Sequence, residues 1–540
     1  MKTNILYFPL LVLLSAVSLC GCSNDDEPVV TATDGTMLTV TARADGFAST
    51  DGTAQTGTPQ TRATESGYTT TFVKDDQIGV FAVKDGSVIA DCQNVPCTYN
   101  GTTWNGTVYK YAGATYFAYY PYTASMNDKT SVDAIVTAFN NTVATVTDQS
   151  TYAKYTACDL MTTTGGVSPT SSSLSFTFTH RMSLIEISLP VQKYKTTSNA
   201  NAYEYSAPVL GATFSLTPSG SGATTIKPYP MGNGAFRYIV PASTSGATVS
   251  GAFNTADDKT IEYSKSSLSL SAGNYKRLNV TYSGAPSTPT ERALAVGDFY
   301  YSDGSICPGA ASNPPKEGCI GIVYWLGDIK GDNYTLLDSQ FPSGTHGLVV
   351  SLWDMPAPDN PSNTTMTWTY GGYEYVNNWL GSATWSGTVS KPSGFSSIQV
   401  TDKMQGYANT VALEEYNKYV ENTGSGKNQN LRVKPIKGLS AFQTAHPAPV
   451  SSSGWYWPSV CELKQVCWGQ GNSSGTSGKS MLNPKITQVG GTSFADDRYW
   501  SSAESSNDSG NARGVSFSNG AVGSSNKGSI AYLVRPLLAF

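Results

Sequence analysis

The chain has 540 residues, and only 14% of them are charged, with a formal net charge of −5 at pH 7. This balance argues against a nucleic-acid partner, which would require a basic face. Glycine, serine, threonine and tyrosine are abundant and long helical patterns are nearly absent, so we expect a mainly β protein with polar turns. A chain of this length suggests about three domains.

Residues 1–22 read as a lipoprotein signal peptide. Lys2 supplies a positive start and an apolar run follows it. That run is short for a membrane span and no second one follows, so we do not expect a transmembrane protein. Leu19-Cys20-Gly21-Cys22 resembles a bacterial lipobox with Cys22 as the lipidated residue. Cys20 fits less well because Leu19 is bulky for the position before cleavage; the alternative is an ordinary signal peptide with incidental cysteines.

The next segment, 23–36, is a polar tether. Its acidic run Asp25, Asp26 and Glu27 resembles the signal that directs lipoproteins of Bacteroides-like bacteria to the outer face of the outer membrane. We therefore expect a lipoprotein precursor displayed at the cell surface.

Short strand patterns follow the tether. Met37–Arg43 alternates apolar and polar residues, which predicts a strand, and the polar residues 44–67 after it predict a loop. Further β-rich runs, including Leu174–Pro190, recur between turn signals, as in a β-sandwich. We assign 37–192 to a first domain, 198–283 to a second, and the proline- and threonine-bearing 284–292 to a linker.

Several of these segments resemble the fimbrillin family, the type V pilins of Bacteroides-like bacteria. They are the acidic tether, "TRA" in the first loop, "DDQIGVFAV", "FTHRMSLIEISL" and "LSAGNYKRLNVTY". The resemblance covers about 37–283 and implies two tandem transthyretin-like β-sandwiches.

The resemblance also implies a processing site. In type V pilins an arginine-specific protease cuts in the loop after the first strand and removes that strand. The groove left behind is filled by a strand from a neighbouring subunit through main-chain hydrogen bonds. Arg62 and Ala63 stand in the corresponding loop, although an arginine in a polar loop is also simply common. Arg43–Ala44 is a weaker candidate because it abuts the strand.

Residues 293–540 differ in character. Helical patterns appear at Asn409–Asn422 and within Trp455–Gln470, where Ser459 and Glu462 form a capping-box pattern. The order "WPSVCEL", "YWSSAES", "VRPLLAF" is similar to bacterial C-type-lectin-like domains, which implies an α+β fold for this region.

Together these resemblances favour a fimbrial tip subunit and adhesin. Stalk pilins of the family end in a donor strand, whereas here another domain follows Leu278–Tyr282, so the chain would accept a strand without passing one on. The expected partners are other fimbrial subunits, with a host or bacterial glycan or protein as a candidate for the C-terminal domain. The alternative is a permanently anchored cell-surface glycan-binding lipoprotein, which would keep Met37–Arg43.

We predict no enzyme, cofactor or metal. The three histidines have no zinc-site spacing with cysteine, and a "GxSxG" nucleophile motif is missing. The loop Asp354–Asn363 is acidic, but a solvated loop is the simpler interpretation than calcium binding. Ligand-binding residues are not identified by the sequence. Exposed tryptophans can stack on sugar rings, but we expect most of the nine after residue 300 in the core; they are Trp325, Trp353, Trp368, Trp379, Trp385, Trp455, Trp457, Trp468 and Trp500.

Of nine cysteines, Cys20 and Cys22 belong to the signal region. Two of the remaining pairs, Cys92 with Cys97 and Cys307 with Cys319, could close small loops, because export permits disulfides. Cys461 and Cys467 bring sulfatase-activating enzymes to mind, but apolar neighbours on a helix favour inert structural thiols.

Overall fold

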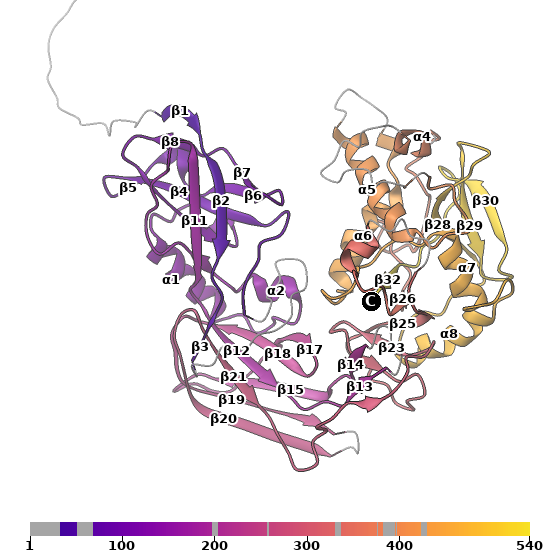
Figure 1. Cartoon of the computed structure of the whole chain (residues 1–540), viewed down its shortest axis with the longest axis horizontal. Helices are drawn as coiled ribbons and strands as arrows, with labels where there is room; N and C mark the ends of the chain where they lie inside the picture. Colours follow the sequence, from indigo (N-terminus) through magenta and orange to yellow (C-terminus); the bar gives the residue numbers. More distant parts are fainter. Residues whose placement is uncertain are drawn as a thin grey trace, which may run out of the picture.

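A computed structural model describes residues 33–50, 68–196, 203–255, 259–329, 336–374, 376–381, 395, 397–422 and 429–540. The protein is mainly β with few helices. Three units follow one another along the chain (Figure 1): an N-terminal unit (33–180, indigo to purple), a middle unit (183–282, magenta) and a C-terminal unit (293–540, orange to yellow). The N-terminal and C-terminal units stand on opposite sides of the view, above the middle unit.

The N-terminal unit is built on an eight-stranded sheet that closes on itself. The strand order is β5-β4-β6-β7-β2-β11-β10-β9, and β4 also pairs with β9. A separate ladder joins β1 to β8. The strands are β1 (Thr33–Met37), β2 (Thr39–Ala44), β4 (Gln77–Lys84), β5 (Ser87–Val88), β6 (Val95–Tyr99), β7 (Trp104–Asn105), β8 (Tyr109–Tyr111), β9 (Thr115–Tyr120), β10 (Met161–Thr162) and β11 (Ser173–His180).

Alternation of side chains in these strands fills the closed sheet. Val40, Val80, Trp104 and Phe176 meet inside it in one buried cluster. Two helices lie outside the sheet: α1 (Val132–Val143), which begins after the N-cap Ser131, and α2 (Tyr152–Thr156).

The middle unit consists of two facing sheets. One has the order β17-β18-β12-β21-β3 and the other β16-β15-β19-β20. Ile185, Phe214, Val249 and Leu268 belong to the buried cluster between them. The strands are β3 (Ala48–Ser49), β12 (Ser183–Ser188), β15 (Leu210–Thr217), β16 (Thr224–Thr225), β17 (Tyr229–Gly232), β18 (Ala235–Val240), β19 (Thr244–Asn254), β20 (Thr260–Leu270) and β21 (Asn274–Asn279).

A small sheet joins the middle and C-terminal units. It consists of β13 (Lys193–Lys195), β14 (Glu204–Ser206) and β22 (Thr290–Glu291), in the order β14-β13-β22. The expected linker 284–292 therefore contains a paired strand. Arg292 donates to both Asp298 and the Tyr205 hydroxyl, which ties this strand to the start of the C-terminal unit.

The C-terminal unit combines two sheets with helices. Their orders are β24-β23-β25-β26-β32 and β27-β31-β28-β29-β30. The strands are β23 (Phe299–Tyr301), β24 (Ile306–Cys307), β25 (Cys319–Leu326), β26 (Gly347–Ser351), β27 (Thr365–Met366), β28 (Arg498–Glu504), β29 (Asn511–Ser516), β30 (Val522–Asn526), β31 (Tyr532–Leu533) and β32 (Leu537–Ala539). The helices are α3 (Leu337–Gln340), α4 (Val376–Leu380), α5 (Gly406–Asn422), α6 (Lys434–Ala445), α7 (Val460–Trp468) and α8 (Ser477–Gln488).

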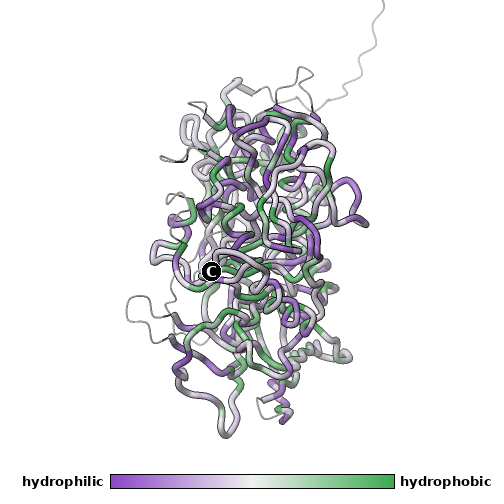
Figure 2. The backbone as a smooth tube through the Cα atoms, turned by 90° about the vertical axis from the view of Figure 1, so that its right-hand side faces the viewer, coloured by the Kyte–Doolittle hydropathy of each residue, from purple (hydrophilic) through white to green (hydrophobic). Residues whose placement is uncertain are grey.

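Several elements confirm the sequence interpretation. The strand predicted at 37–43 is present as β2, the helix at 409–422 lies within α5, and α7 begins with the full capping box of Ser459 and Glu462. Hydrophobic and hydrophilic residues alternate at short intervals along the described part of the backbone (Figure 2). That pattern is typical of sheets with one buried face.

Other elements differ from the expectation. The run Leu174–Pro190 contains two strands in different sheets, because the chain leaves the N-terminal unit after His180 and β12 pairs with β18 and β21. The boundary between the first two units therefore lies near residue 182 rather than 192. The loop expected at 44–67 contains β3, and α1 was not foreseen.

Candidate functional site

The first strands complete the N-terminal sheet. β2 runs parallel to β11 in register from Thr39 opposite Ser173 to Ala44 opposite Phe178. On its other side Val40 lies opposite Trp104 of β7. The Leu38 and Val40 side chains are buried, whereas Thr39 between them is exposed. β2 is thus an inner strand whose apolar side chains form part of the core.

The same segment continues into the middle unit. After β2 the chain crosses to β3, which pairs in parallel with β21 through Ala48 opposite Asn274. Between the two strands the buried Phe47 ring stacks on His180, with ring centroids 3.7 Å apart. Residues 33–49, which we call the leading segment, therefore complete sheets in two units.

Thr50 and Tyr68, the described residues on either side of 51–67, both contact Tyr275 of β21. The Thr50 amide donates to the Tyr275 carbonyl at 3.2 Å, and the Tyr68 ring stacks on the Tyr275 ring at 3.5 Å. Arg237 lies over the Tyr68 ring and forms a buried ion pair with Glu186 at 2.8 Å. The Tyr68 side chain is thus held by residues of β12, β18 and β21, while its carbonyl accepts from the Phe47 amide of the leading segment at 2.8 Å.

The predicted processing residues fall differently. Cys22, Arg62 and Ala63 lie outside the described residues. Arg43 is described: its side chain is exposed beside Asp45, but its backbone lies within the β2–β11 ladder. A protease that requires an extended, accessible chain would have to open that ladder first, which keeps Arg43–Ala44 the weaker candidate.

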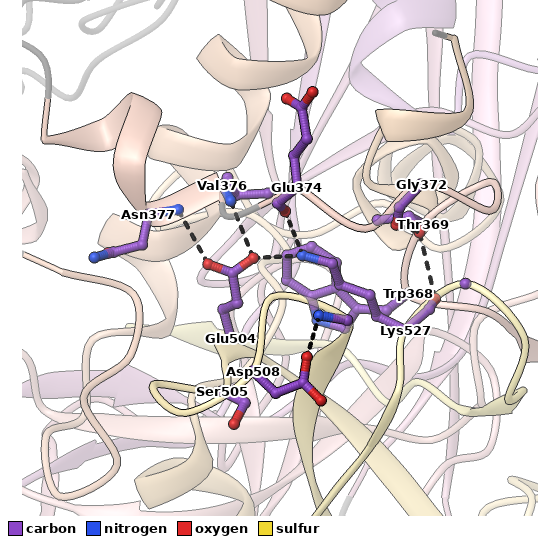
Figure 3. Close-up of polar contacts among 12 residues, drawn as sticks. Trp368, Thr369, Gly372, Glu374, Val376, Asn377, Glu504, Ser505, Asp508 and Lys527 are labelled. Atoms are coloured by element: carbon purple, nitrogen blue, oxygen red, sulfur yellow. Dashed lines mark hydrogen bonds and ion pairs between the residues drawn. The ribbon is translucent and has the colours of Figure 1, made fainter.

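A network of buried charged groups connects β28, the end of β30 and the start of α4 in the C-terminal unit (Figure 3). The Lys527 ammonium donates to the Glu504 carboxylate and to the Glu374 carbonyl, and neither Lys527 nor Glu504 side chain is exposed to solvent. Glu504 also accepts from the amides of Val376 and Asn377 at the start of α4. Burial lowers the pKa of Lys527, opposed by the nearby Glu504 charge.

The described tryptophans of this unit divide into buried and half-buried residues: Trp368, Trp455, Trp457 and Trp500 are buried, whereas Trp325, Trp353, Trp379 and Trp468 are half-buried. Trp368, Trp457 and Trp500 are fully buried, and each indole N–H donates to a backbone carbonyl. In the acidic loop after β26, Asp354 pairs with Arg535 and Asp359 with Lys434. Trp385 lies outside the described residues.

No disulfide joins the cysteines of the described residues. Cys92, Cys97, Cys307 and Cys319, for which loop-closing disulfides were possible, are free and buried. Burial raises the pKa of Cys461 and of Cys467 to about 11, so both are protonated at neutral pH.

Within the described ranges we find neither a cluster of three metal-ligating side chains nor a helix long and apolar enough to cross a membrane.

Two half-buried histidines predict a dependence of stability on pH. His346 stacks on Tyr203 at 4.1 Å and His446 on Trp353 at 3.9 Å, and burial lowers the pKa of both imidazoles. The unfolded chain therefore binds more protons below a pH of about 6.5, so folding stability falls as the pH drops through that value. Replacing both by phenylalanine keeps the ring stacks and should reduce the loss of melting temperature between neutral and mildly acidic buffer. An unchanged difference would contradict this assignment.

Sequence reasoning missed the second half of the leading segment. Its only signal is Phe47, a single aromatic residue in an otherwise polar stretch. The burial of that ring against His180 depends on residues more than a hundred positions away, which no local pattern reveals.

The chain is similar to several known proteins. The family described as Fimbrillin-like matches residues 61–295. A Bacteroides ovatus protein that bears the provisional name fimbrium tip subunit Fim1C is 30% identical over 523 residues, which cover 90% of each chain. Among solved structures, a fimbrial protein from Bacteroides ovatus is 25% identical and covers 94% of this chain and 99% of its own, with a TM-score of 0.46. A cell adhesion protein of Bacteroides uniformis, also provisionally named, is 16% identical over 40% of this chain and 90% of its own, with a TM-score of 0.28.

Proposed function

The chain belongs to the fimbrillin-like family, and on this premise we propose that it is the tip subunit of a fimbrium, with an adhesive C-terminal unit. The proposal includes export as a lipoprotein through Cys22, cleavage between Arg62 and Ala63, and assembly by donor-strand exchange. The observation that carries it is the placement of the leading segment, which completes two sheets and lies wholly upstream of Arg62.

Cleavage after Arg62 would separate the leading segment from its sheets. The strands β11 and β21 would then each lose a parallel neighbour, and unpaired backbone groups of a sheet edge bind another strand readily. Because Tyr68 is held by the middle unit, the remaining chain would keep its own attachment at the new N-terminal side. An acceptor site for the strand of another subunit is the expected result.

The C-terminal unit supports a terminal position in the fimbrium. Its last strand, β32, pairs with β26, and the Phe540 carbonyl accepts from the His346 amide at 2.6 Å. Leu537, Leu538 and Ala539 are fully buried. Donating this strand to another subunit would expose the core of its own unit, so β32 is unsuited to act as a donor.

We infer that the N-terminal and middle units are transthyretin-like variants and that the C-terminal unit is C-type-lectin-like. A family of fimbrial subunits has structural and adhesive roles, so we infer no catalytic activity for the chain.

N-terminal sequencing of the protein in isolated fimbriae, with labelled antibody to locate it, tests the proposal. A mature chain that begins at Ala63 and is labelled at fimbrial ends is the expected result. A chain that begins at lipidated Cys22 and is absent from fimbriae would support the anchored glycan-binding alternative.

The lipid anchor gives a separate prediction. Cys22→Ala should abolish fatty-acid labelling of the precursor and keep it from the outer membrane surface, because Cys22 is the thiol that follows the small residue Gly21 in the lipobox. Cys20→Ala is the matched control and should label normally. Labelling of Cys22→Ala but not of Cys20→Ala would assign the lipid to Cys20.

A further inference from the structure

A cavity of about 300 Å³ lies where the three units meet. Each unit contributes to its wall: Tyr152 of α2 from the N-terminal unit, Tyr229 and Met231 of β17 from the middle unit, and Asp303 and Val450 from the C-terminal unit. We call it the junction pocket. Pockets between domains are common positions for small-ligand sites, and this volume is at the lower end of their range.

The wall between the N-terminal and middle units is held by backbone pairing. The Gln149 amide donates to the Lys227 carbonyl and the Lys227 amide donates to the Thr147 carbonyl, both at 2.8 Å. The Gln149 side chain bonds both backbone groups of Ile239. Tyr152 and Tyr229 are therefore fixed relative to each other, with ring centroids 5.5 Å apart.

The wall between the middle and C-terminal units is equally close. A Cβ atom at Gly232 would stand 2.6 Å from the Asp303 carbonyl oxygen, so only glycine fits at this contact. On the same side Tyr203, another lining residue, stacks on His346. Both contacts indicate a pocket that is formed before any ligand arrives.

The chemistry of the lining favours hydroxyl groups. Asp303 Oδ1 accepts from the Ser305 amide and hydroxyl, whereas Oδ2 accepts from none of the described residues. The Ser302 and Ser451 hydroxyls, which also line the pocket, have no hydrogen-bond partner in the described chain. Donors and acceptors are thus both available beside tyrosine rings, which suits groups that donate and accept at once.

The charged residues that line the pocket indicate the charge of a suitable ligand. Among the described residues that form the pocket, Asp303 and Glu204 are acidic and none is Lys, Arg or His. An anionic ligand would meet no counter-charge. A ligand with only cationic groups could bind the tyrosine rings and the carboxylates, but it would form no hydrogen bond to the serine hydroxyls.

We propose that the junction pocket binds a neutral mono- or disaccharide, which stacks on a tyrosine ring and donates a hydroxyl hydrogen bond to Asp303. This deepens the adhesive part of the proposed function and rests on it. The pocket would place the sugar between the units rather than on the outer loops of the C-terminal unit.

The test measures binding by the purified full chain, using galactose, N-acetylglucosamine, mannose, fucose and lactose as probes and choline as the cationic comparison. Binding of at least one sugar is expected by calorimetry or saturation-transfer NMR. Asp303→Asn keeps an acceptor for the Ser305 turn but removes the carboxylate charge, and Val450→Trp fills the pocket from an exposed position. Each should weaken binding at least about tenfold, equivalent to about 1.4 kcal/mol.

Two matched controls lie elsewhere in the same unit. Asp508 accepts from the Gly510 amide in a similar turn, and Val522 is 39% exposed compared with 37% for Val450. Asp508→Asn and Val522→Trp should leave the affinity unchanged, and all four variants should melt as the parent does. Binding of choline alone, of no probe, or of a sugar that survives both pocket variants would overturn the proposal. The binding assay does not depend on fimbrial assembly. A chain that binds no sugar would therefore reject the pocket proposal but not the tip assignment. A chain that binds sugar but never joins fimbriae would reject only the tip assignment.

Discussion

Replacing Lys527 by methionine is expected to lower the free energy of unfolding by about 3–5 kcal/mol, because it leaves the Glu504 carboxylate buried without its cation. The loss extends beyond one ion pair. The Lys527 ammonium also donates to the Glu374 carbonyl, so this side chain joins the end of β30 to the segment before α4. Chemical denaturation followed by tryptophan fluorescence measures the change.

A second variant separates the charge from the packing. Glu504→Gln combined with Lys527→Met removes both charges and keeps one acceptor oxygen beside the Val376 and Asn377 amides, which in the parent each bond a different carboxylate oxygen. The double variant should therefore be more stable than Lys527→Met alone. Lys437→Met is the control, because Lys437 pairs with Glu421 in a partly exposed position where an ion pair contributes about 0–1 kcal/mol. If the two substitutions in the buried pair simply add, the stranded charge is not the cause of the loss.

How much of this fold was predictable depended on the range of the interactions. The capping box of α7 lies within four residues, and its signal is fully local: Ser459 accepts from the Glu462 amide and Glu462 accepts from the Ser459 amide. Alternation likewise marked β2 as a strand with a buried face. Both features depend on neighbours in the sequence, so a sequence pattern was sufficient.

The partners of each strand could not be predicted, because they depend on residues distant in the sequence. Leu174–Pro190 reads as one β-rich run, yet β11 lies beside β2 and β12 lies between β18 and β21. Alternation states that a strand has two faces and says nothing about which sheet it joins. The closure of the N-terminal sheet through β4 and β9 and the pairing of β3 with β21 have the same origin.

The candidate site was predictable only in part. The family resemblance placed a removable strand at 37–43, and β2 confirms that a buried inner strand lies there. The junction pocket could not be foreseen, because its lining comes from segments as distant as Tyr152 and Val450. The cleavage position itself stays a prediction.

The strongest expected effect is on the protein trimmed after Arg62. Leu38, Val40 and Phe47 are each at least 94% buried, and burial of such side chains contributes roughly 1.5–3 kcal/mol each. Loss of the leading segment would thus remove roughly 5–9 kcal/mol, comparable with the whole stability of a typical domain, about 5–15 kcal/mol. Once its leading segment has been removed, the trimmed chain should melt at a markedly lower temperature or aggregate.

A synthetic peptide with the sequence of residues 33–49 should restore that melting temperature. The same peptide with Val40→Asp should fail, since Val40 is fully buried, whereas Thr39→Asp should act like the parent, since Thr39 faces solvent. A peptide that ends at Ala44 lacks both Phe47 and β3 and should restore less. Equal rescue by the Val40 and Thr39 variants would show that the peptide does not occupy the place of β2.

An assembly experiment with the same trimmed chain tests where the subunit lies in the fimbrium. Because the leading segment completes both the N-terminal and the middle unit, a donor strand from a stalk subunit should gain its full affinity only by spanning both sheets. Arg62→Ala should block trimming and leave the fold intact, and mixing the trimmed chain with purified stalk subunits should place it at filament ends only, because β32 is already paired in its own unit. Labelling along the shaft would contradict the tip assignment, and the absence of incorporation, with residues 33–62 still present on cells, would favour the anchored alternative.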